Sequence, residues 1–180
     1  MKRRGILTVV AAALWLLAVA GSAGAQSQAR AELKDGEGKS VGMATLREAK
    51  DGVLLSAQVK GLSQGLHAIH VHAVGKCEGP KFTSAGGHFN PGNTKHGLKS
   101  SEGPHAGDMP NMHATKAAVA RYETLNDRIS LGRGESSVFD ADGSAVVVHA
   151  VADDDVTDPA GSAGDRVACG VITKVTPKKK

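Results

Sequence analysis

The sequence predicts an all-β protein, an antiparallel sandwich or barrel of about eight short strands with two long loops. Apolar and polar residues alternate in several short runs, which is the period of a strand with one buried face. Turn residues, chiefly Gly and Asp, recur about every ten residues between these runs. A helical period of useful length is absent from the sequence of the expected domain. These three observations favour the β class over any mixed architecture.

The first three strands are expected at residues 29–34, 41–48 and 53–60. Gly-containing turns at 35–38 and 50–52 separate them and predict hairpins. In the third run, every second side chain is apolar and lies on one face of the strand: Val53, Leu55, Ala57 and Val59. A fourth strand is expected after Gly65, and it carries several histidines.

Two long segments lack strand alternation. Residues 73–114 are rich in Gly, Pro, Asn, Ser and His, and residues 153–165 combine two glycines with five aspartates. A loop as long as the first is uncommon inside a compact domain and is usually functional. The remaining strands are expected at 117–122, 128–131, 144–151 and 167–175.

The N-terminus has the pattern of a secretory signal peptide over residues 1–25. Basic residues precede an apolar run at 6–20, and small residues follow it before Gln26. The competing interpretation is a membrane anchor, but an apolar run of about fifteen residues is shorter than the roughly twenty needed to span a bilayer. We expect residues 26–180 to form one exported domain with a basic tail at 176–180 and no stable membrane insertion. The periplasm is the expected location, with secretion or the cell surface as alternatives.

The charge of the mature protein argues against binding to nucleic acid. The whole chain has 22 Lys and Arg against 18 Asp and Glu. Cleavage would remove three basic residues (Lys2, Arg3 and Arg4), so 19 basic residues would remain against 18 acidic ones, a net charge of +1. No basic patch with aromatic residues is left in the expected domain. About 155 residues suit a single domain.

Cys77 and Cys169 are the only cysteines of the chain. An exported protein matures where thiols oxidise, so we expect a structural disulfide that closes a loop of about ninety residues. The alternative is a pair of free cysteines at a redox site. Their spacing is nothing like the CxxC motif of such sites, which favours the disulfide.

Six of the eight histidines lie between His67 and Asp108, which predicts a metal site. His70 and His72 are two residues apart, so both rings should leave one face of a strand, with Ile69 and Val71 facing the interior. His67 has the opposite parity, and we interpret it as a structural histidine satisfied by hydrogen bonds. His149 ends an apolar run. A lone histidine there would usually be structural, so only the presence of the other histidines favours His149 as a ligand.

The first long loop adds three imidazoles and one carboxylate, which form a plausible closed tetrahedral zinc set. These residues are His88, His96, His105 and Asp108. The remaining set of imidazoles suits copper better than a hard cation. Seven candidate ligands are too many for one ion, so two metals are the simplest hypothesis.

Six motifs carry a family resemblance: GLHAIHVH, SAGGHFNP, KHG, GPHAGD, VVVHAVADD and GDRVACGVI. In this order and spacing, from about Leu66 to Ile172, they resemble the copper/zinc superoxide dismutases, and the spacing between Cys77 and SAGGHFNP is similar to that of the bacterial exported branch. The resemblance implies a Greek-key β-barrel that converts superoxide to dioxygen and hydrogen peroxide with a redox-cycling copper and a structural zinc.

The resemblance also implies a role for each site residue. Copper would be held by His70, His72, His88 and His149, and zinc by His88, His96, His105 and Asp108. His88 would bridge both ions as an imidazolate and carry a proton during turnover. Asp153 would accept hydrogen bonds from one copper and one zinc histidine, His70 and His96. Arg166 would attract the substrate beside the open copper position, and Cys77 and Cys169 would form the family's disulfide.

Some features depart from the pattern or stay open. The loop around Arg166 is acidic, and Ala160 replaces a threonine that is common near the channel mouth of the animal enzymes. One of the lysines near the loops could steer the substrate, and the alternative is that all of them are solvated surface charges. These lysines are Lys76, Lys81, Lys95 and Lys99. His113 matches no ligand position and is expected in an exposed loop. A homodimer is left open, and the competing functions are a non-catalytic copper-binding or chaperone protein on this fold and a zinc hydrolase.

Overall fold

The computed structural model describes residues 27–176, so the expected signal peptide and most of the basic tail lie outside the described residues. The described part is almost entirely β-structure, with a single 3-10 turn, η1 (Thr83–Ala85). The strands are β1 (Gln28–Lys34), β2 (Ser40–Ala49), β3 (Gly52–Lys60), β4 (Gly65–His67), β5 (Ile69–His72), β6 (Met112–Ala114), β7 (Val119–Asn126), β8 (Ala145–His149), β9 (Arg166–Val171) and β10 (Thr173–Lys174). The all-β prediction is confirmed, with two more strands than the eight expected because short segments pair separately.

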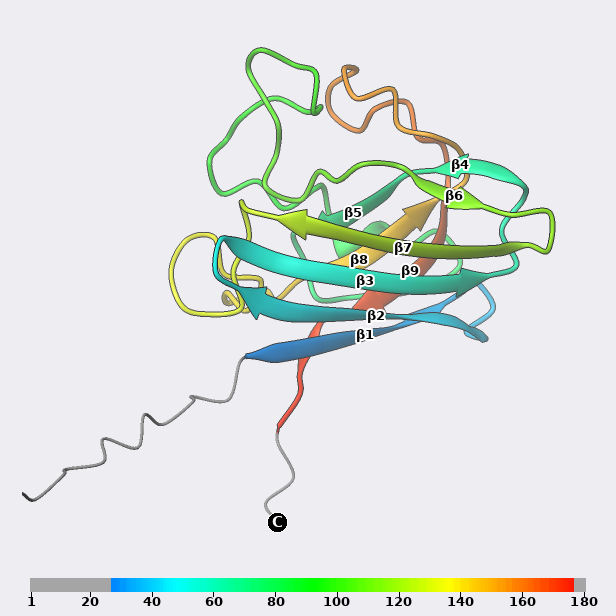
Figure 1. The fold of residues 1–180 in the computed structure, drawn as a ribbon, viewed down its shortest axis with the longest axis horizontal. Helices are drawn as coiled ribbons and strands as arrows, with labels where there is room; N and C mark the ends of the chain where they lie inside the picture. Colours follow the sequence, from blue (N-terminus) through cyan, green and yellow to red (C-terminus); the bar gives the residue numbers. More distant parts are fainter. Residues whose placement is uncertain (1–26, 177–180) are drawn as a thin grey trace, which may run out of the picture.

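The strands form one antiparallel sheet that curls into a nearly closed barrel. Their order is β4-β6-β7-β3-β2-β1-β9-β8-β5, with β10 added beside β1. In Figure 1, β1, β2, β3 and β7 make the near wall, and β5, β8 and β9 cross behind them. The two end strands are consecutive in the chain, and Ala68 between them exchanges backbone hydrogen bonds with His149 and Val151. Non-consecutive neighbours such as β3 beside β7 and β1 beside β9 require crossovers of the Greek-key kind.

The barrel interior is filled by small and branched apolar side chains. Val53, Leu55 and Val59 of β3 are fully buried, as their alternation predicts. The same cluster receives Ile69 and Val71 from β5, which alternate with the two histidines of that strand. The strand that carries His70 and His72 is therefore fixed by the burial of its other face in the barrel core. Within residues 27–176, no helix is long and apolar enough to cross a membrane.

The first three predicted strands agree with β1 to β3, whereas the later ones shift. β7 begins and ends later than the predicted strand at 117–122. The predicted strand at 144–151 is shortened to β8. The last one divides into β9 and β10 around the buried Ile172.

The predicted strand at 128–131 is wrong. Only an isolated bridge between Ser130 and Ser137 forms there. The guanidinium of Arg128 donates instead to the backbone carbonyls of His105 and Asp108, at 3.4 and 2.8 Å. This segment therefore packs against the first long loop rather than against a neighbouring strand.

The two long loops are confirmed as irregular segments, and residues 127–144 form a third one between β7 and β8. Residues 73–111 contain only the turn η1, and the last three residues of the predicted loop form β6. No strand occurs in 150–165. Figure 1 shows the two loops, in green and orange, side by side at one end of the barrel. A hydrogen bond between His96 and Asp153 joins them.

Candidate metal centre

Two groups of potential metal ligands lie where the long loops meet β5 and β8. His70, His72, His88 and His149 form one group, and His88, His96, His105 and Asp108 form the other. Within each group the ligand atoms lie within 4.8 Å of one another, and all seven residues are buried. The structure therefore brings together every residue that the sequence predicts as a ligand.

The four-histidine group presents nitrogen atoms with no partner. One nitrogen of His70 pairs with Asp153 Oδ2 at 2.7 Å, and one nitrogen of His72 pairs with the Gly86 carbonyl at 3.0 Å. The opposite ring nitrogens, together with Nε2 of His88 and His149, are buried without a hydrogen-bond partner among residues 27–176. A buried polar atom left without a partner is costly. Four such imidazole nitrogens facing one point are a donor set that fits a copper ion.

His67 is bound by hydrogen bonds and takes no part in either group. Its Nδ1 lies 2.8 Å from the His149 carbonyl oxygen, and its Nε2 lies 2.9 Å from the carbonyl oxygen of Ser63. The prediction of a structural histidine is confirmed. The reason differs, because Ala68 interrupts the strand and simple parity does not extend from His70 back to His67.

The second group has the dimensions of a tetrahedral site. Asp108 Oδ1 lies 2.8, 3.1 and 3.5 Å from the Nδ1 atoms of His88, His96 and His105 respectively. The Nδ1 atoms of His88 and His105 are 3.4 Å apart. Four ligands at zinc bond lengths of about 2.0–2.1 Å would be separated by about 3.3 Å in a tetrahedron. Three imidazoles and one carboxylate with these separations therefore fit zinc.

His88 belongs to both groups. Its Nδ1 faces Asp108, and its Nε2 is one of the unpartnered nitrogens of the four-histidine group. Its backbone forms an isolated bridge with that of His72, which holds the first loop against β5. A single ring can thus reach both metal positions through opposite nitrogens.

Asp153 connects the two groups from outside. Its two carboxylate oxygens lie 2.7 Å from His70 Nε2 and 3.0 Å from His96 Nε2. The backbone N–H and carbonyl of Asp153 each pair at 2.8 Å with the side-chain amide of Asn111. Gly161 packs so closely that a Cβ there would collide with this carboxylate. Carboxylates in this position fix the orientation of metal-binding imidazoles.

The protonation states follow from burial and charge. Burial lowers the pKa of His70 to about 4 and that of His149 to about 3, so both rings are neutral at physiological pH, as ligands must be. For His96, burial acts to lower the pKa, but hydrogen bonds to Asp108 and Asp153 outweigh it and raise the pKa to about 10. Burial acts to raise the pKa of Asp108, and the hydrogen bonds from His88 and His96 hold it well below the usual range. A metal entering the second group therefore displaces a proton from His96.

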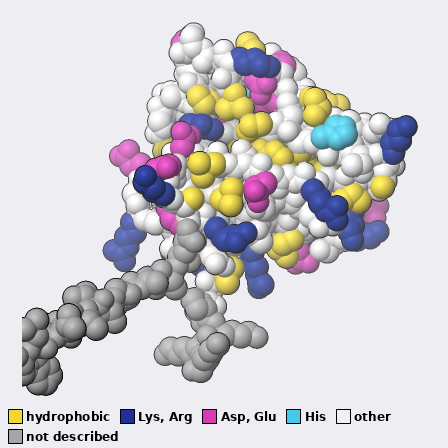
Figure 2. Space-filling view, in the orientation of Figure 1, with side chains coloured by type: hydrophobic (Ala, Val, Ile, Leu, Met, Phe, Trp, Pro, Cys, Tyr) yellow, Lys and Arg dark blue, Asp and Glu magenta, His cyan; other side chains and the backbone are white. Residues whose placement is uncertain are grey.

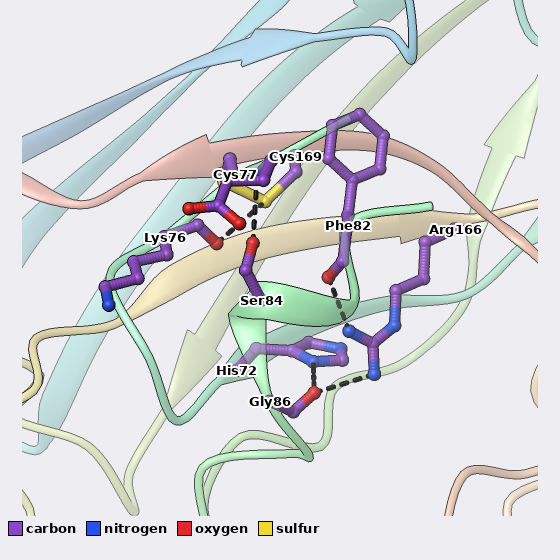
Figure 3. Close-up of a disulfide and its surroundings, with 9 residues drawn as sticks. His72, Lys76, Cys77, Phe82, Ser84, Gly86, Arg166 and Cys169 are labelled. Carbon is purple, nitrogen blue, oxygen red and sulfur yellow. Dashed lines mark hydrogen bonds between the residues drawn. A yellow bond between two sulfur atoms is a disulfide. The ribbon is translucent and has the colours of Figure 1, made fainter. Parts of the chain in front are cut away.

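Arg166 begins β9 at the edge of the four-histidine group. Its guanidinium donates to the carbonyls of Phe82 and Gly86, both at 2.7 Å, and the Gly86 carbonyl also pairs with His72 (Figure 3). It lines a surface pocket together with Lys81 and Asp165. Because a guanidinium keeps its charge at physiological pH, this pocket offers a cation beside the histidines.

The predicted disulfide is confirmed. Cys77 and Cys169 are bonded, with their Cα atoms 5.6 Å apart, and the bond ties the first long loop to β9 (Figure 3). The described part of the chain contains no free cysteine.

Three contributors to the site carry no sequence signal that predicts them. Asn111 holds the backbone of Asp153, Arg128 holds the backbone around Asp108, and Phe82 holds Arg166. Asn111 and Arg128 bind backbone groups of another segment, whereas Phe82 uses its own carbonyl to bind the side chain of Arg166. A polar or aromatic residue in a loop gives no local indication of such a long-range contact.

The fold and the site define a β-barrel protein with two adjacent groups of potential metal ligands, one of four imidazoles and one of three imidazoles and a carboxylate. A family model described as copper/zinc superoxide dismutase matches residues 40–172. The chain is 46% identical over 159 residues to the Cu-Zn superoxide dismutase 2 of Aquifex aeolicus, covering 87% of this chain and 93% of that protein. It is 46% identical over 147 residues to the Cu-Zn superoxide dismutase of Caulobacter vibrioides, covering 80% and 84%. The crystal structure of a SOD-like protein from Bacillus subtilis has a TM-score of 0.76 and 34% identity, covering 79% and 96% of the two chains.

The chain belongs to the copper/zinc superoxide dismutase family. Family members use copper and zinc, which agrees with the two donor sets described above.

Proposed function

We propose that the protein is a superoxide dismutase that converts two superoxide anions and two protons into dioxygen and hydrogen peroxide. The observation that carries this proposal is the convergence of four unpartnered imidazole nitrogens beside the guanidinium of Arg166. A redox metal would sit in the four-histidine group, and an anion would be drawn to the adjacent cation. A non-catalytic copper-binding protein would have no need of Arg166 in this position.

We assign copper to His70 Nδ1 and to the Nε2 atoms of His72, His88 and His149. We assign zinc to the Nδ1 atoms of the loop histidines (His88, His96 and His105) and to Asp108. The unpartnered nitrogens support the first assignment, and the separations around Asp108 Oδ1 support the second. Bound copper supplies the one-electron couple that oxidises one superoxide and reduces the next.

The residues of the chain supply binding, orientation and proton transfer. Arg166 attracts superoxide and orients it, because its guanidinium is fixed by two carbonyl groups. In the half of the cycle in which His88 Nε2 would not hold copper, it would take up a proton and give it to the departing peroxide, and solvent would supply the second proton. Asp153 keeps His70 and His96 in their metal-binding orientation.

The proposed function is tested by loading the mature protein with copper and zinc and measuring both metals per chain. Superoxide consumption is then measured against a competing reductant dye. One copper and one zinc per chain with rapid consumption are expected. Activity no higher than that of a His149→Ala variant, or a copper content well below one per chain, would overturn the proposal.

Electrostatic steering is expected to depend on Lys81. Lys81 lines the same pocket as Arg166, whereas Lys99 and Lys95 are paired with Asp155 and Asp158, at 2.8 and 3.6 Å. On the face shown in Figure 2, basic and acidic side chains are interspersed, so a single broad basic patch does not dominate it. A charge beside the site is therefore expected to matter more than the overall field.

Lys81→Glu is expected to lower kcat/KM about threefold at low ionic strength, below the roughly 10- to 1000-fold that the combined charges of a cleft give to association rates, because only one charge is changed. The loss should shrink near 0.15 M salt, where the screening length is about 8 Å. Stopped-flow rates over a series of salt concentrations measure this effect. The matched control is Lys50→Glu, in the exposed turn between β2 and β3, and an equal loss in both variants would contradict a local role.

We further propose that the protein is exported and that residues 1–25 are removed at the cell membrane. A structural disulfide between Cys77 and Cys169 supports an oxidising compartment. N-terminal sequencing of the protein from separated cell fractions should give a mature chain beginning near Gln26 in the periplasm. Light scattering on the same material decides between a monomer and the homodimer left open by the sequence.

A further inference from the structure

Phe82 has an unusual backbone conformation for a bulky residue. It lies in the left-handed region, with φ of 53° and ψ of 27°, at the N-terminal end of η1. Non-glycine residues hold this conformation only where the surrounding structure enforces it, and such positions cluster at functional sites. The strained residue directly contacts Arg166, which makes its conformation relevant to the site.

The buried side chain of Phe82 holds the residue in its left-handed conformation. It is 2% exposed and belongs to a small apolar cluster, separate from the barrel core, that also contains the two disulfide cysteines. The other members of this cluster are Ala85, Ala145 and Val147. Figure 3 shows the ring near the disulfide and the carbonyl of Phe82 turned toward Arg166. Burial of the ring thus fixes the peptide unit that faces the guanidinium.

The turn η1 holds Arg166 at both of its ends. The Phe82 carbonyl accepts from Arg166 Nη1 at 2.7 Å and from the N–H of Ala85 at 3.1 Å. The Gly86 carbonyl accepts from Arg166 Nη2 at 2.7 Å and pairs with His72 Nδ1 at 3.0 Å. Both guanidinium contacts within the described residues are therefore made by carbonyls that flank one short turn, and one of them is shared with a predicted copper ligand.

We propose that Phe82 is a positioning residue for superoxide dismutation: its buried ring locks the turn whose carbonyls orient Arg166 toward the four-histidine group. This inference rests on the proposed function, since it concerns the placement of the substrate-binding cation. Without the ring, the left-handed residue can relax, and relaxation rotates the carbonyl away from Arg166. A leucine fills much of the same apolar space, so it preserves the lock better than an alanine.

The test is a double-mutant cycle in the metal-loaded protein. The variants are Phe82→Ala, Phe82→Leu, Arg166→Ala and the two double variants that combine Arg166→Ala with each change at Phe82. Copper and zinc content and free thiols are measured for each. Two readouts follow: kcat/KM for superoxide, and the affinity for azide, an anion probe, from the visible spectrum of the copper protein.

We expect Phe82→Ala to lower kcat/KM and azide affinity by about tenfold, less than the roughly hundredfold cost of misplacing a reacting group by 1 Å. Phe82→Leu should recover most of that loss, and the Arg166→Ala background should remove the effect of either change. Metal content and the disulfide should be unaffected. If Phe82→Ala fails to fold, the cycle with Phe82→Leu gives the same comparison with a smaller effect.

Three outcomes overturn the inference. Equal losses from Phe82→Ala with and without Arg166 would mean that Phe82 does not act through the guanidinium. Free thiols or lost copper in Phe82→Ala would assign the effect to general stability. A fully active Arg166→Ala variant would instead overturn the role of Arg166 in the proposed function, and the inference with it.

Discussion

The His88→Ala variant is expected to lose both metals, although only one side chain is removed. His88 is the one residue shared by the two ligand groups, with Nδ1 beside Asp108 and Nε2 among the unpartnered nitrogens. Changing a residue that merely orients a ligand typically costs 10- to 100-fold in metal affinity. Removing a ligand common to both sites should therefore lower the affinity for each metal by at least about 100-fold and reduce dismutation to background.

Two single-site variants are the matched controls. His149→Ala should lose copper and keep zinc, and His105→Ala should lose zinc and keep copper, because each residue belongs to one group only. Competition with a chelator of known affinity, followed by metal analysis, separates the three patterns. Zinc bound by His88→Ala as tightly as by the unaltered protein would show that His88 does not bridge the sites.

The regular part of the fold follows from local patterns in the sequence. Apolar residues at every second position of β3 place Val53, Leu55 and Val59 in the core, and the intervening turns define the hairpins. The two-residue spacing of His70 and His72 likewise puts both rings into one ligand group, with Val71 between them in the core. Period-2 geometry predicts these features because neighbouring strands preserve it.

The irregular parts could not be predicted in the same way. Arg128 was expected in a strand, but its guanidinium bonds to the carbonyls of His105 and Asp108, 23 and 20 residues earlier in the chain. Similarly, the side-chain amide of Asn111 pairs with both the N–H and the carbonyl of Asp153, as a neighbouring strand would. These hydrogen bonds depend on where two loops come into contact in the folded chain, and no residue pattern within either loop predicts that contact.

The resemblance to known enzymes predicts the ligand set but not what supports it. The motifs named every member of the two ligand groups, because metal ligands are constrained in both type and spacing. The strained Phe82 is a different case. Its apolar side chain and its carbonyl act in opposite directions, one toward the disulfide and one toward Arg166, and only the folded turn reveals both.

Loss of the disulfide is expected to produce the largest change in the stability of the metal-free protein. The bond joins cysteines 92 residues apart, and a loop of this size corresponds to about 4–5 kcal/mol in the chain-entropy model. Cys169 is buried, so Cys77→Ser combined with Cys169→Ala avoids placing a hydroxyl in the apolar cluster. We expect the free energy of unfolding to fall by about 2–5 kcal/mol, which lowers Tm on the order of 10 °C for a domain of this size.

Urea unfolding of this double variant in the presence of a chelator measures the effect, because bound metal would stabilise the folded state and mask the difference. The unaltered protein in a strong reductant is the control, since it lacks the bond but keeps both side chains. Agreement between the two losses assigns the effect to the covalent link between the first loop and β9. A loss below about 1 kcal/mol in both, well under the usual cost of removing a native disulfide, would mean that the contacts of η1 and β9 hold the loop without it.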